Sequence, residues 1–201
     1  MIRKINLILK RIVDLLGSSI GLILLAIPLA VIAVKIKKDS PGPVFFKQER
    51  LGKDGIPFFI IKFRTMVVNA EKIGTGLKVK DDTDDRITRI GHFLRKTSLD
   101  ELPQLINVWK GDMSLVGPRP PVTYHPYQGL EGYPEEMKKR FDMRPGMTGL
   151  AQVEVRNSVS WDGRIAYDIR YIEQFNLALD VRILLKTVRK VVKSDSIYAN
   201  R

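Results

Sequence analysis

The sequence contains no cysteine and only two histidines, and these absences exclude several kinds of site. Without cysteine there is neither a disulfide nor a thiolate ligand for a metal, which is compatible with a reducing compartment such as the cytoplasm. His92 and His125 have no neighbours that suggest metal ligation, so we interpret both as structural or exposed. The chain also lacks internal repeats and a glycine-rich nucleotide loop of the Gly-x-Gly-x-x-Gly or Walker type.

Positive charge, by contrast, is abundant. The chain has 34 Lys and Arg against 22 Asp and Glu, which gives a net charge of +12. This excess favours anionic partners, namely nucleic acid, phospholipid headgroups or phosphorylated substrates, and does not choose among them. At 201 residues the chain is long enough for one domain with its own core and an appendage.

An uncharged run from Leu15 to Val34 has the length of a helix that crosses a bilayer. Pro28 lies in its second half, where it removes a helical hydrogen bond and bends the helix. Basic residues flank both ends of the run: Arg3, Lys4, Lys10 and Arg11 before it, and Lys35, Lys37 and Lys38 after it. Because positive flanks mark the cytoplasmic side, this pattern favours a helix that breaks and returns to the same leaflet. Hydropathy alone favours the alternative, a single-pass anchor with a tolerated proline.

Turn-forming residues at 39–43 predict a boundary between a membrane anchor, residues 1–38, and a cytoplasmic domain, residues 39–201. Aromatic and β-branched stretches at 44–46 and 57–63 predict a small β-hairpin. We expect helices over 86–95, 99–109, 133–141, 161–175 and 180–193, a short strand over 150–155, and loops over 111–121 and 144–149. The predicted fold class is α+β: an N-terminal re-entrant membrane helix followed by a mainly helical domain with a small hairpin.

The last expected helix, residues 180–193, is amphipathic and basic. Its pattern is typical either of a surface helix packed on the core or of a helix in an anionic membrane interface. Beside a membrane anchor we favour the interfacial helix. The acidic stretch Asp81 to Asp85 is interpreted as a solvated loop rather than a metal site.

Two adjacent carboxylates, Asp100 and Glu101, stand where a helix is expected to begin, because Pro103 is tolerated only in a first turn. Alone, this position fits an ordinary N-cap aspartate. Cations recur nearby in the sequence or in rigid loops: Lys62 and Arg64 at a strand end, Arg95 upstream, Arg119 in Gly-Pro-Arg-Pro and Arg144 in Arg-Pro-Gly. Together they offer cations for a diphosphate and carboxylates for a divalent metal or for nucleophilic attack.

With these motifs the chain resembles the small monotopic phosphoglycosyl transferases, a family of bacterial sugar transferases. The resemblance covers nearly the whole chain and rests on the basic N-terminal segment with Pro28 and on the motifs Lys62-Phe63-Arg64-Thr65-Met66, Ser98 to Gln104, Asn107 to Met113, Gly117-Pro118-Arg119-Pro120 and Arg144 to Val153. One departure is Ile27, which precedes Pro28 where the family often has serine.

The resemblance implies an Mg²⁺-dependent enzyme that moves a sugar 1-phosphate from a UDP-sugar to undecaprenyl phosphate and releases UMP. This would be the first membrane step of glycoconjugate synthesis, at the cytoplasmic face of a bacterial inner membrane. Asp100 would be the nucleophile that forms a covalent phosphosugar intermediate, and Glu101 would assist with the metal or the acceptor's proton. Both carboxylates are candidate Mg²⁺ ligands, and the candidate phosphate-binding residues are Lys62, Arg64, Arg95, Arg119 and Arg144. The sequence leaves the sugar, the pathway and the oligomeric state open.

Two other classes of protein compete with this interpretation. A membrane-tethered basic module for anionic lipid or nucleic acid would explain the charge, but the aromatics form no RRM-like signature and the helices no evident helix-turn-helix, so no nucleic-acid partner is expected. A hydrolase that uses an aspartyl phosphate would yield free sugar phosphate without a lipid acceptor. Magnesium-dependent release of UMP distinguishes the transferase from the binding module.

Overall fold

The computed structural model describes residues 2–73, 76, 83–155 and 158–192. The elements, in chain order, are α1 (Ile2–Leu24), α2 (Ala26–Asp39), β1 (Phe45–Leu51), η1 (Lys53–Gly55), β2 (Pro57–Phe63), η2 (Ala70–Lys72), α3 (Arg89–Thr97), η3 (Leu99–Glu101), α4 (Gln104–Lys110), β3 (Ser114–Val116), α5 (Glu135–Lys138), η4 (Lys139–Phe141), β4 (Gly146–Thr148), α6 (Leu150–Glu154), α7 (Trp161–Glu173) and α8 (Leu177–Val192). This is a mainly helical α+β fold with a small antiparallel hairpin, as predicted.

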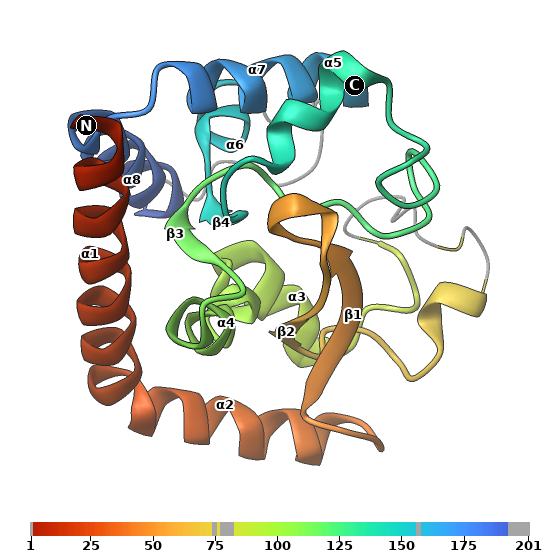
Figure 1. Cartoon of the computed structure of the whole chain (residues 1–201). Coiled ribbons are helices and arrows are strands. Elements are labelled where there is room, and N and C mark those ends of the chain that lie inside the picture. The colour runs from red at the N-terminus through yellow and green to blue at the C-terminus, as the bar shows by residue number, and fades with distance from the viewer. Residues whose placement is uncertain (1, 74–75, 77–82, 156–157, 193–201) are drawn as a thin grey trace.

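The two N-terminal helices meet at a bend of 62°, and Figure 1 shows α1 along one side of the molecule with α2 beneath it. Among the described residues no single helix is long and apolar enough to cross a membrane, whereas α1 and α2 together have the length and composition of a broken span or a re-entrant loop. The break lies at Leu25, ahead of Pro28. Pro28 therefore occupies the first turn of α2, where a missing N–H leaves no helical hydrogen bond unmade. The prediction that the helix is broken is confirmed, but the break precedes the proline.

Buried polar contacts fix α1 to the rest of the chain. The Lys10 ammonium lies 2.6 Å from Asp180 of α8, and the Tyr171 hydroxyl donates a hydrogen bond of 2.7 Å to the same carboxylate. Asp14 accepts hydrogen bonds from the Ser114 hydroxyl and from the Leu115 N–H. The N-terminal helix is thus packed on α8 and β3 rather than connected to them only by a linker.

The helix α2 packs on the domain through apolar side chains. Ile32 and Ile36 are buried against Phe63 of β2 and Leu94 of α3. The helix ends at Asp39, close to the boundary expected from the turn-forming residues. The division into an anchor, residues 1–38, and a catalytic domain, residues 39–201, stays a prediction.

The predicted β-hairpin is confirmed, with a longer first strand than expected. Phe45 pairs with Phe63 at its open end, and Leu51 pairs with Pro57 beside the turn. The segment 47–50 is polar and was not expected to be a strand, but its backbone completes the ladder with β2. The Asn107 amide covers the other edge of β2, since it donates to the Phe59 carbonyl and accepts from the Ile61 N–H.

A second, parallel pair of strands lies in two segments that were expected to be loops. Ser114 of β3 pairs with Gly146 of β4, and Val116 pairs with Thr148. The backbones approach so closely that a Cβ atom at Gly146 would lie 2.0 Å from the Gly117 nitrogen. Glycine here permits close backbone packing, which explains why a glycine-rich sequence forms a strand instead of a loop.

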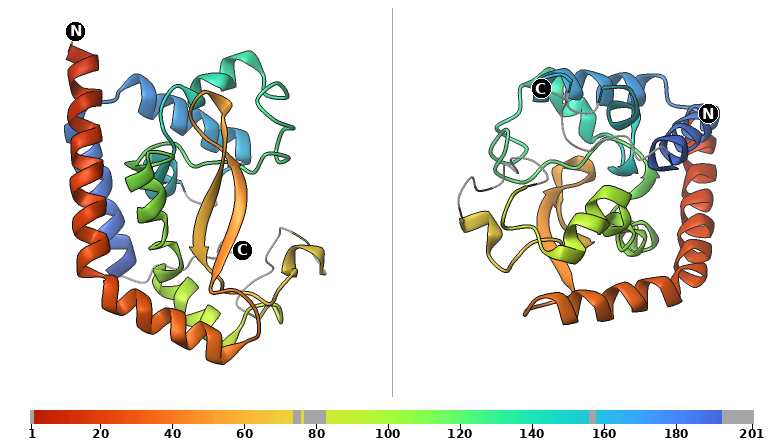
Figure 2. Two further views of the ribbon diagram at one scale, coloured as in Figure 1. Left: turned by 60° about the horizontal axis from the view of Figure 1, so that its bottom comes forward. Right: turned by 180° about the vertical axis from the view of Figure 1, so that it is seen from behind.

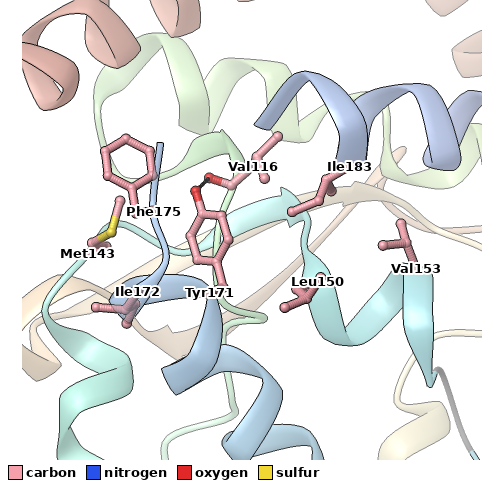
Figure 3. Close-up of a cluster of buried hydrophobic side chains, with 8 residues drawn as sticks. All are labelled: Val116, Met143, Leu150, Val153, Tyr171, Ile172, Phe175 and Ile183. Carbon is pink, nitrogen blue, oxygen red and sulfur yellow. Dashed lines mark hydrogen bonds between the residues drawn. The ribbon is translucent and has the colours of Figure 1, made fainter. Parts of the chain in front are cut away.

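The prediction of a strand at 150–155 is wrong, because residues Leu150–Glu154 form the helix α6. Leu150 and Val153 point from this helix into the main core, which Figure 3 shows between β3, α6, α7 and α8. The spacing of these two residues fits a short helix as well as a strand, and packing decides between them. The cluster consists of Val116, Met143, Leu150, Val153, Tyr171, Ile172, Phe175 and Ile183.

The acidic stretch is not simply a solvated loop. Asp84 is buried and pairs with Arg86 at 2.8 Å, and Arg86 also donates to the carbonyls of Ala70, Ile73 and Gly76. The interpretation as a solvated loop is therefore wrong for Asp84. Its buried carboxylate binds Arg86 through both oxygens, and Arg86 in turn holds the backbone of the preceding segment. Asp81 and Asp82 lie outside the described residues.

Apolar side chains are exposed along α8 and along the two N-terminal helices. On α8, Val181, Leu185 and Val188 keep 55%, 67% and 61% of their accessible surface, whereas Ile183 on the opposite face is buried. Figure 2 shows α8 running beside α1, where Ile12, Leu16 and Ile23 are also exposed. A large exposed apolar surface is unusual for a water-soluble protein and indicates a binding surface.

Candidate functional site

Asp100 and Glu101 lie in the 3₁₀ turn η3, which connects α3 to α4. Ser98 begins this turn in the left-handed conformation, with φ of 57°. The helix α4 starts only at Gln104, and Pro103 occupies its N-cap position. The position of Asp100 in the sequence alone fits an N-cap residue, but in the structure Asp100 caps neither η3 nor α4. Its carboxylate is available for another role.

The pair opens into a cavity of about 1170 Å³. Its wall is formed by the hairpin, the end of α3, η3, the loop after β3, and parts of α6, α7 and α8. Six of the seven candidate catalytic and phosphate-binding residues line it: Lys62, Arg64, Arg95, Asp100, Glu101 and Arg119. Segments far apart in the sequence thus place two carboxylates and several cations around one space.

Glu101 is held by Lys62 of β2. The Lys62 ammonium donates a hydrogen bond of 2.6 Å to the Glu101 carboxylate. Burial by itself raises the pKa of Glu101, but the charges of Lys62 and Arg119 outweigh it and lower the pKa to about 2. Glu101 is therefore ionised at neutral pH, with its orientation fixed by the lysine.

Asp100 has the opposite shift. Burial and the negative charge of Glu101 raise the pKa of Asp100 to about 6, against the opposing charges of Lys62 and Arg95. The environment thus makes Asp100 the more basic of two adjacent carboxylates, although it is still mainly ionised at pH 7. Carboxylates whose pKa values are pushed apart in this way commonly have different roles in catalysis.

Two arginines present cationic groups beside this pair. Arg95, at the end of α3, has a buried Nε atom with no hydrogen-bond partner within the described part of the chain. Arg119 sits in a loop that is fixed at both sides, because the Gly146 N–H donates to the Pro118 carbonyl and Arg50 donates to the Pro120 carbonyl. A guanidinium on such a rigid loop can bind a phosphate with little loss of side-chain freedom.

Two predicted phosphate-binding residues have other contacts. Arg64 is buried, and its three nitrogens donate to the Pro43 carbonyl and to the hydroxyl and carbonyl of Ser40. It therefore fixes the linker between α2 and β1, although it borders the cavity. Arg144 is exposed, donates to the Gly111 carbonyl, and does not contribute to the cavity wall. The structure does not bring Arg144 to the other cations.

The sequence analysis missed a buried ion pair on the same wall. Arg140 lies 2.6 Å from Asp168, and both side chains are almost fully buried. Burial raises the pKa of Asp168 to about 6, although Arg140 acts in the opposite direction. The sequence does contain a signal for this pair. Asp168 lies three residues from both Ile165 and Tyr171, so helical spacing places it on the same buried face of α7. A charged residue on such a face needs a partner.

Asp100 and Glu101 would supply part of the ligand set of a magnesium ion, with a substrate or water supplying the rest. No group of three or more histidine, aspartate or glutamate side chains that could hold a metal occurs in the described ranges. Mg²⁺ is usually bound by one or two carboxylates together with substrate phosphates and water. Asp100 and Glu101, in a cavity that Lys62, Arg95 and Arg119 also line, fit that requirement, so the donors suit an Mg²⁺ ion that arrives with a diphosphate.

Comparison with known proteins agrees with the resemblance seen in the motifs. The family model described as "Bacterial sugar transferase" matches residues 5–194. A galactosyl transferase of Streptococcus agalactiae is 43% identical over 93% of this chain, which covers 43% of that protein. A UDP-glucose:undecaprenyl-phosphate glucose-1-phosphate transferase of Caulobacter vibrioides is 43% identical over 94% of this chain and 72% of its own length. An uncharacterized sugar transferase of Bacillus subtilis is 42% identical over 95% of this chain and 91% of its own.

Proposed function

Because this chain belongs to the bacterial sugar transferase family, we propose that it transfers a sugar 1-phosphate from a UDP-sugar to undecaprenyl phosphate and releases UMP. The chain spans less than half the length of the first curated relatives that it matches. The name of the UDP-glucose:undecaprenyl-phosphate glucose-1-phosphate transferase of Caulobacter vibrioides supports the proposal. The observation that carries the proposal is the pair Asp100 and Glu101 in a cavity with Lys62, Arg95 and Arg119.

In the proposed mechanism Asp100 is the nucleophile. One of its oxygens bonds to the phosphorus that carries the sugar, while the bond from that phosphorus to the bridging oxygen breaks and its electron pair leaves with UMP. A phosphate oxygen of undecaprenyl phosphate then attacks the aspartyl phosphosugar. This second step restores the Asp100 carboxylate and gives a lipid diphosphate that carries the sugar. Two steps keep the two anionic substrates apart, which a direct transfer would not.

The other residues stabilise charge and geometry. Lys62 holds Glu101 ionised beside Asp100, where Glu101 can bind a metal or accept a proton from the acceptor. Arg95 and Arg119 offset the negative charge of the diphosphate and of the transferring phosphorus. Bound Mg²⁺ would add positive charge that stabilises UMP as it leaves.

The reaction is tested by incubating the protein in detergent or nanodiscs with a panel of UDP-sugars and undecaprenyl phosphate, with Mg²⁺ or with EDTA. We expect one or a few UDP-sugars to give UMP and a sugar-diphosphate lipid, in the samples that contain Mg²⁺. Free sugar phosphate formed without the acceptor would indicate a hydrolase instead. Absence of UMP release with every UDP-sugar would favour the membrane-tethered binding module.

We expect Arg119→Ala to lower kcat/KM for the UDP-sugar by about tenfold to a hundredfold, because a charge-assisted contact to phosphate is worth about 1.5–3 kcal/mol. Arg119→Lys should restore only part of the loss, since lysine keeps the charge but not the planar fork. The matched control is Arg144→Ala, which removes an exposed arginine outside the cavity wall. Equal activity of the two alanine variants would contradict a phosphate contact by Arg119.

The exposed apolar faces of α1, α2 and α8 support a location at the cytoplasmic face of a bacterial inner membrane. Lys and Arg residues near these faces can interact with anionic headgroups while the apolar side chains enter the bilayer. A bent pair of helices with basic residues at both ends suits entry into and return to one leaflet. The acceptor phosphate would then lie at the depth of the lipid headgroups.

Cysteine labelling tests this topology, and the chain provides a background without native cysteine. We expect single cysteines at Lys4 and Lys38, both exposed in the structure, to be shielded from a membrane-impermeant thiol reagent in intact cells and labelled after permeabilisation. A cysteine at Lys53 in the hairpin turn reports the side of the domain. Labelling of only one of the two flanks in intact cells would establish a membrane-spanning helix.

A further inference from the structure

The cavity wall differs in chemistry between its two sides. Near the end of α2 it has a group of apolar side chains, Val44, Phe45, Phe63, Met66 and Val67, beside the bonded Arg64. Near α6 and α7 it is polar and aromatic, with Arg140, Gln152, Trp161, Arg164 and Asp168. Figure 1 places α2 and α7 on opposite sides of the molecule. Arg119 connects the catalytic pair to the polar side, because Arg140, the partner of Asp168, donates a hydrogen bond of 2.8 Å to the Arg119 carbonyl, while the Arg119 charge acts on Glu101.

Among the described residues on this side, Arg140, Gln152, Trp161 and Asp168 each have a buried side-chain atom without a hydrogen-bond partner. Gln152 is the residue of this set that leaves both a donor and an acceptor unpaired. It lies on α6 between the buried residues Ala151 and Val153, and it forms part of the cavity wall. Its Oε1 and Nε2 atoms are both buried, and neither has a hydrogen-bond partner in the described structure. Buried amides in folded proteins are nearly always paired, so a primary amide without partners at a cavity wall indicates a group supplied by a ligand.

The amide requires a particular kind of partner. A phosphate or a carboxylate is only an acceptor, so it would satisfy Nε2 and leave Oε1 unpaired. A ring edge with an N–H beside a C=O satisfies both atoms at once, and uracil has this edge. Trp161 also lines the cavity, and the Arg164 guanidinium lies 5.4 Å from the centre of its ring, so this part of the wall contains planar groups of the kind on which a base stacks.

The proposed function, on which this inference rests, indicates which substrate binds on which side of the cavity. The acceptor is a long hydrocarbon with one phosphate, which suits the apolar side at α2 and the membrane surface. The donor's nucleotide then extends from the catalytic pair towards α6 and α7. We propose that Gln152 binds the uracil edge of the UDP-sugar, with Trp161 beside the face of the base, and is therefore a specificity-determining residue for the donor.

The test measures UMP binding by calorimetry with the full chain in nanodiscs, separately from turnover. Gln152→Met keeps the shape of the side chain but removes both polar atoms, and Gln152→Glu removes the donor and places a charge against a uracil carbonyl. We expect both variants to bind UMP about tenfold or more weakly, since a lost bidentate contact has an effect of this size. The donor KM should rise by the same factor, and kcat at saturating donor should stay within about threefold.

The matched control is Gln128→Met, because Gln128 is exposed and lies outside the cavity wall. Thermal unfolding provides a further readout: the melting temperature of Gln152→Met should be unchanged or higher, since the amide has no partner to lose. Unchanged UMP affinity in the Gln152 variants would overturn the inference, and so would a loss of stability in both of them. Wild-type protein that neither binds UMP nor uses any UDP-sugar would instead refute the proposed function.

Discussion

Replacing Asp100 by asparagine is expected to lower the rate of UMP release by about a thousandfold or more, as removal of a catalytic nucleophile commonly does. The amide has nearly the same shape as the carboxylate but cannot form the acyl phosphate. The effect should appear in kcat, because Arg95, Arg119 and Lys62 still bind the donor's phosphates. The measurement is UMP release at saturating UDP-sugar and undecaprenyl phosphate.

The matched control is Asp54→Asn, in the exposed hairpin turn, where the left-handed backbone accepts asparagine as readily as aspartate. Asp100→Asn should fold normally, since it relieves the repulsion between Asp100 and Glu101 that raises the pKa of Asp100 along with burial. Turnover of folded Asp100→Asn at more than a small percentage of the wild-type rate would exclude Asp100 as the nucleophile.

Replacing Lys10 by methionine is expected to destabilise the protein by about 3–5 kcal/mol, because it leaves the Asp180 carboxylate buried without its cation. The Lys10 and Asp180 side chains keep only 7% and 10% of their accessible surface, and the Tyr171 hydroxyl also donates a hydrogen bond to this carboxylate. The readout is equilibrium or thermal unfolding in a detergent that keeps the wild-type protein active.

Lys139→Met is the control for this variant. Lys139 pairs with Glu173 at 2.7 Å, but the side chains keep 45% and 52% of their accessible surface, so the loss should be below about 1 kcal/mol. The double variant Lys10→Met, Asp180→Leu should recover part of the stability, since it removes the unpaired charge. Equal unfolding of the Lys10 and Lys139 variants would show that α1 is not fixed to α8 by this pair.

Local patterns predicted the hairpin and most helices because their signals are contained in a few adjacent residues. The aromatic stretch at 57–63 forms β2, and the segment from Trp161 forms α7. Close packing between distant segments was not predictable in this way. The glycines at 117 and 146 look like loop residues until the backbones of β3 and β4 are seen to require them. For the same reason Leu150 and Val153 were assigned to a strand.

The candidate site shows the same division. Adjacent residues in a motif identified Asp100 and Glu101, and the structure places them in a cationic cavity. The contacts of each arginine side chain depend on residues that are distant in the sequence, so the sequence could not rank the candidate arginines. Arg119 lines the cavity, Arg64 is bonded to the linker after α2, and Arg144 lies outside the cavity wall. The pairing of Arg140 with Asp168 joins two segments that no local pattern connects.

The central claim is that Asp100 carries the phosphosugar between donor and acceptor, and intact-protein mass spectrometry after incubation with UDP-sugar and Mg²⁺, without undecaprenyl phosphate, tests it most directly. We expect a mass increase of one sugar phosphate that maps to Asp100, disappears when undecaprenyl phosphate is added, and does not form in Asp100→Asn. An adduct on another residue, or rapid turnover of a UDP-sugar with no adduct on trapping at any time, would contradict the account.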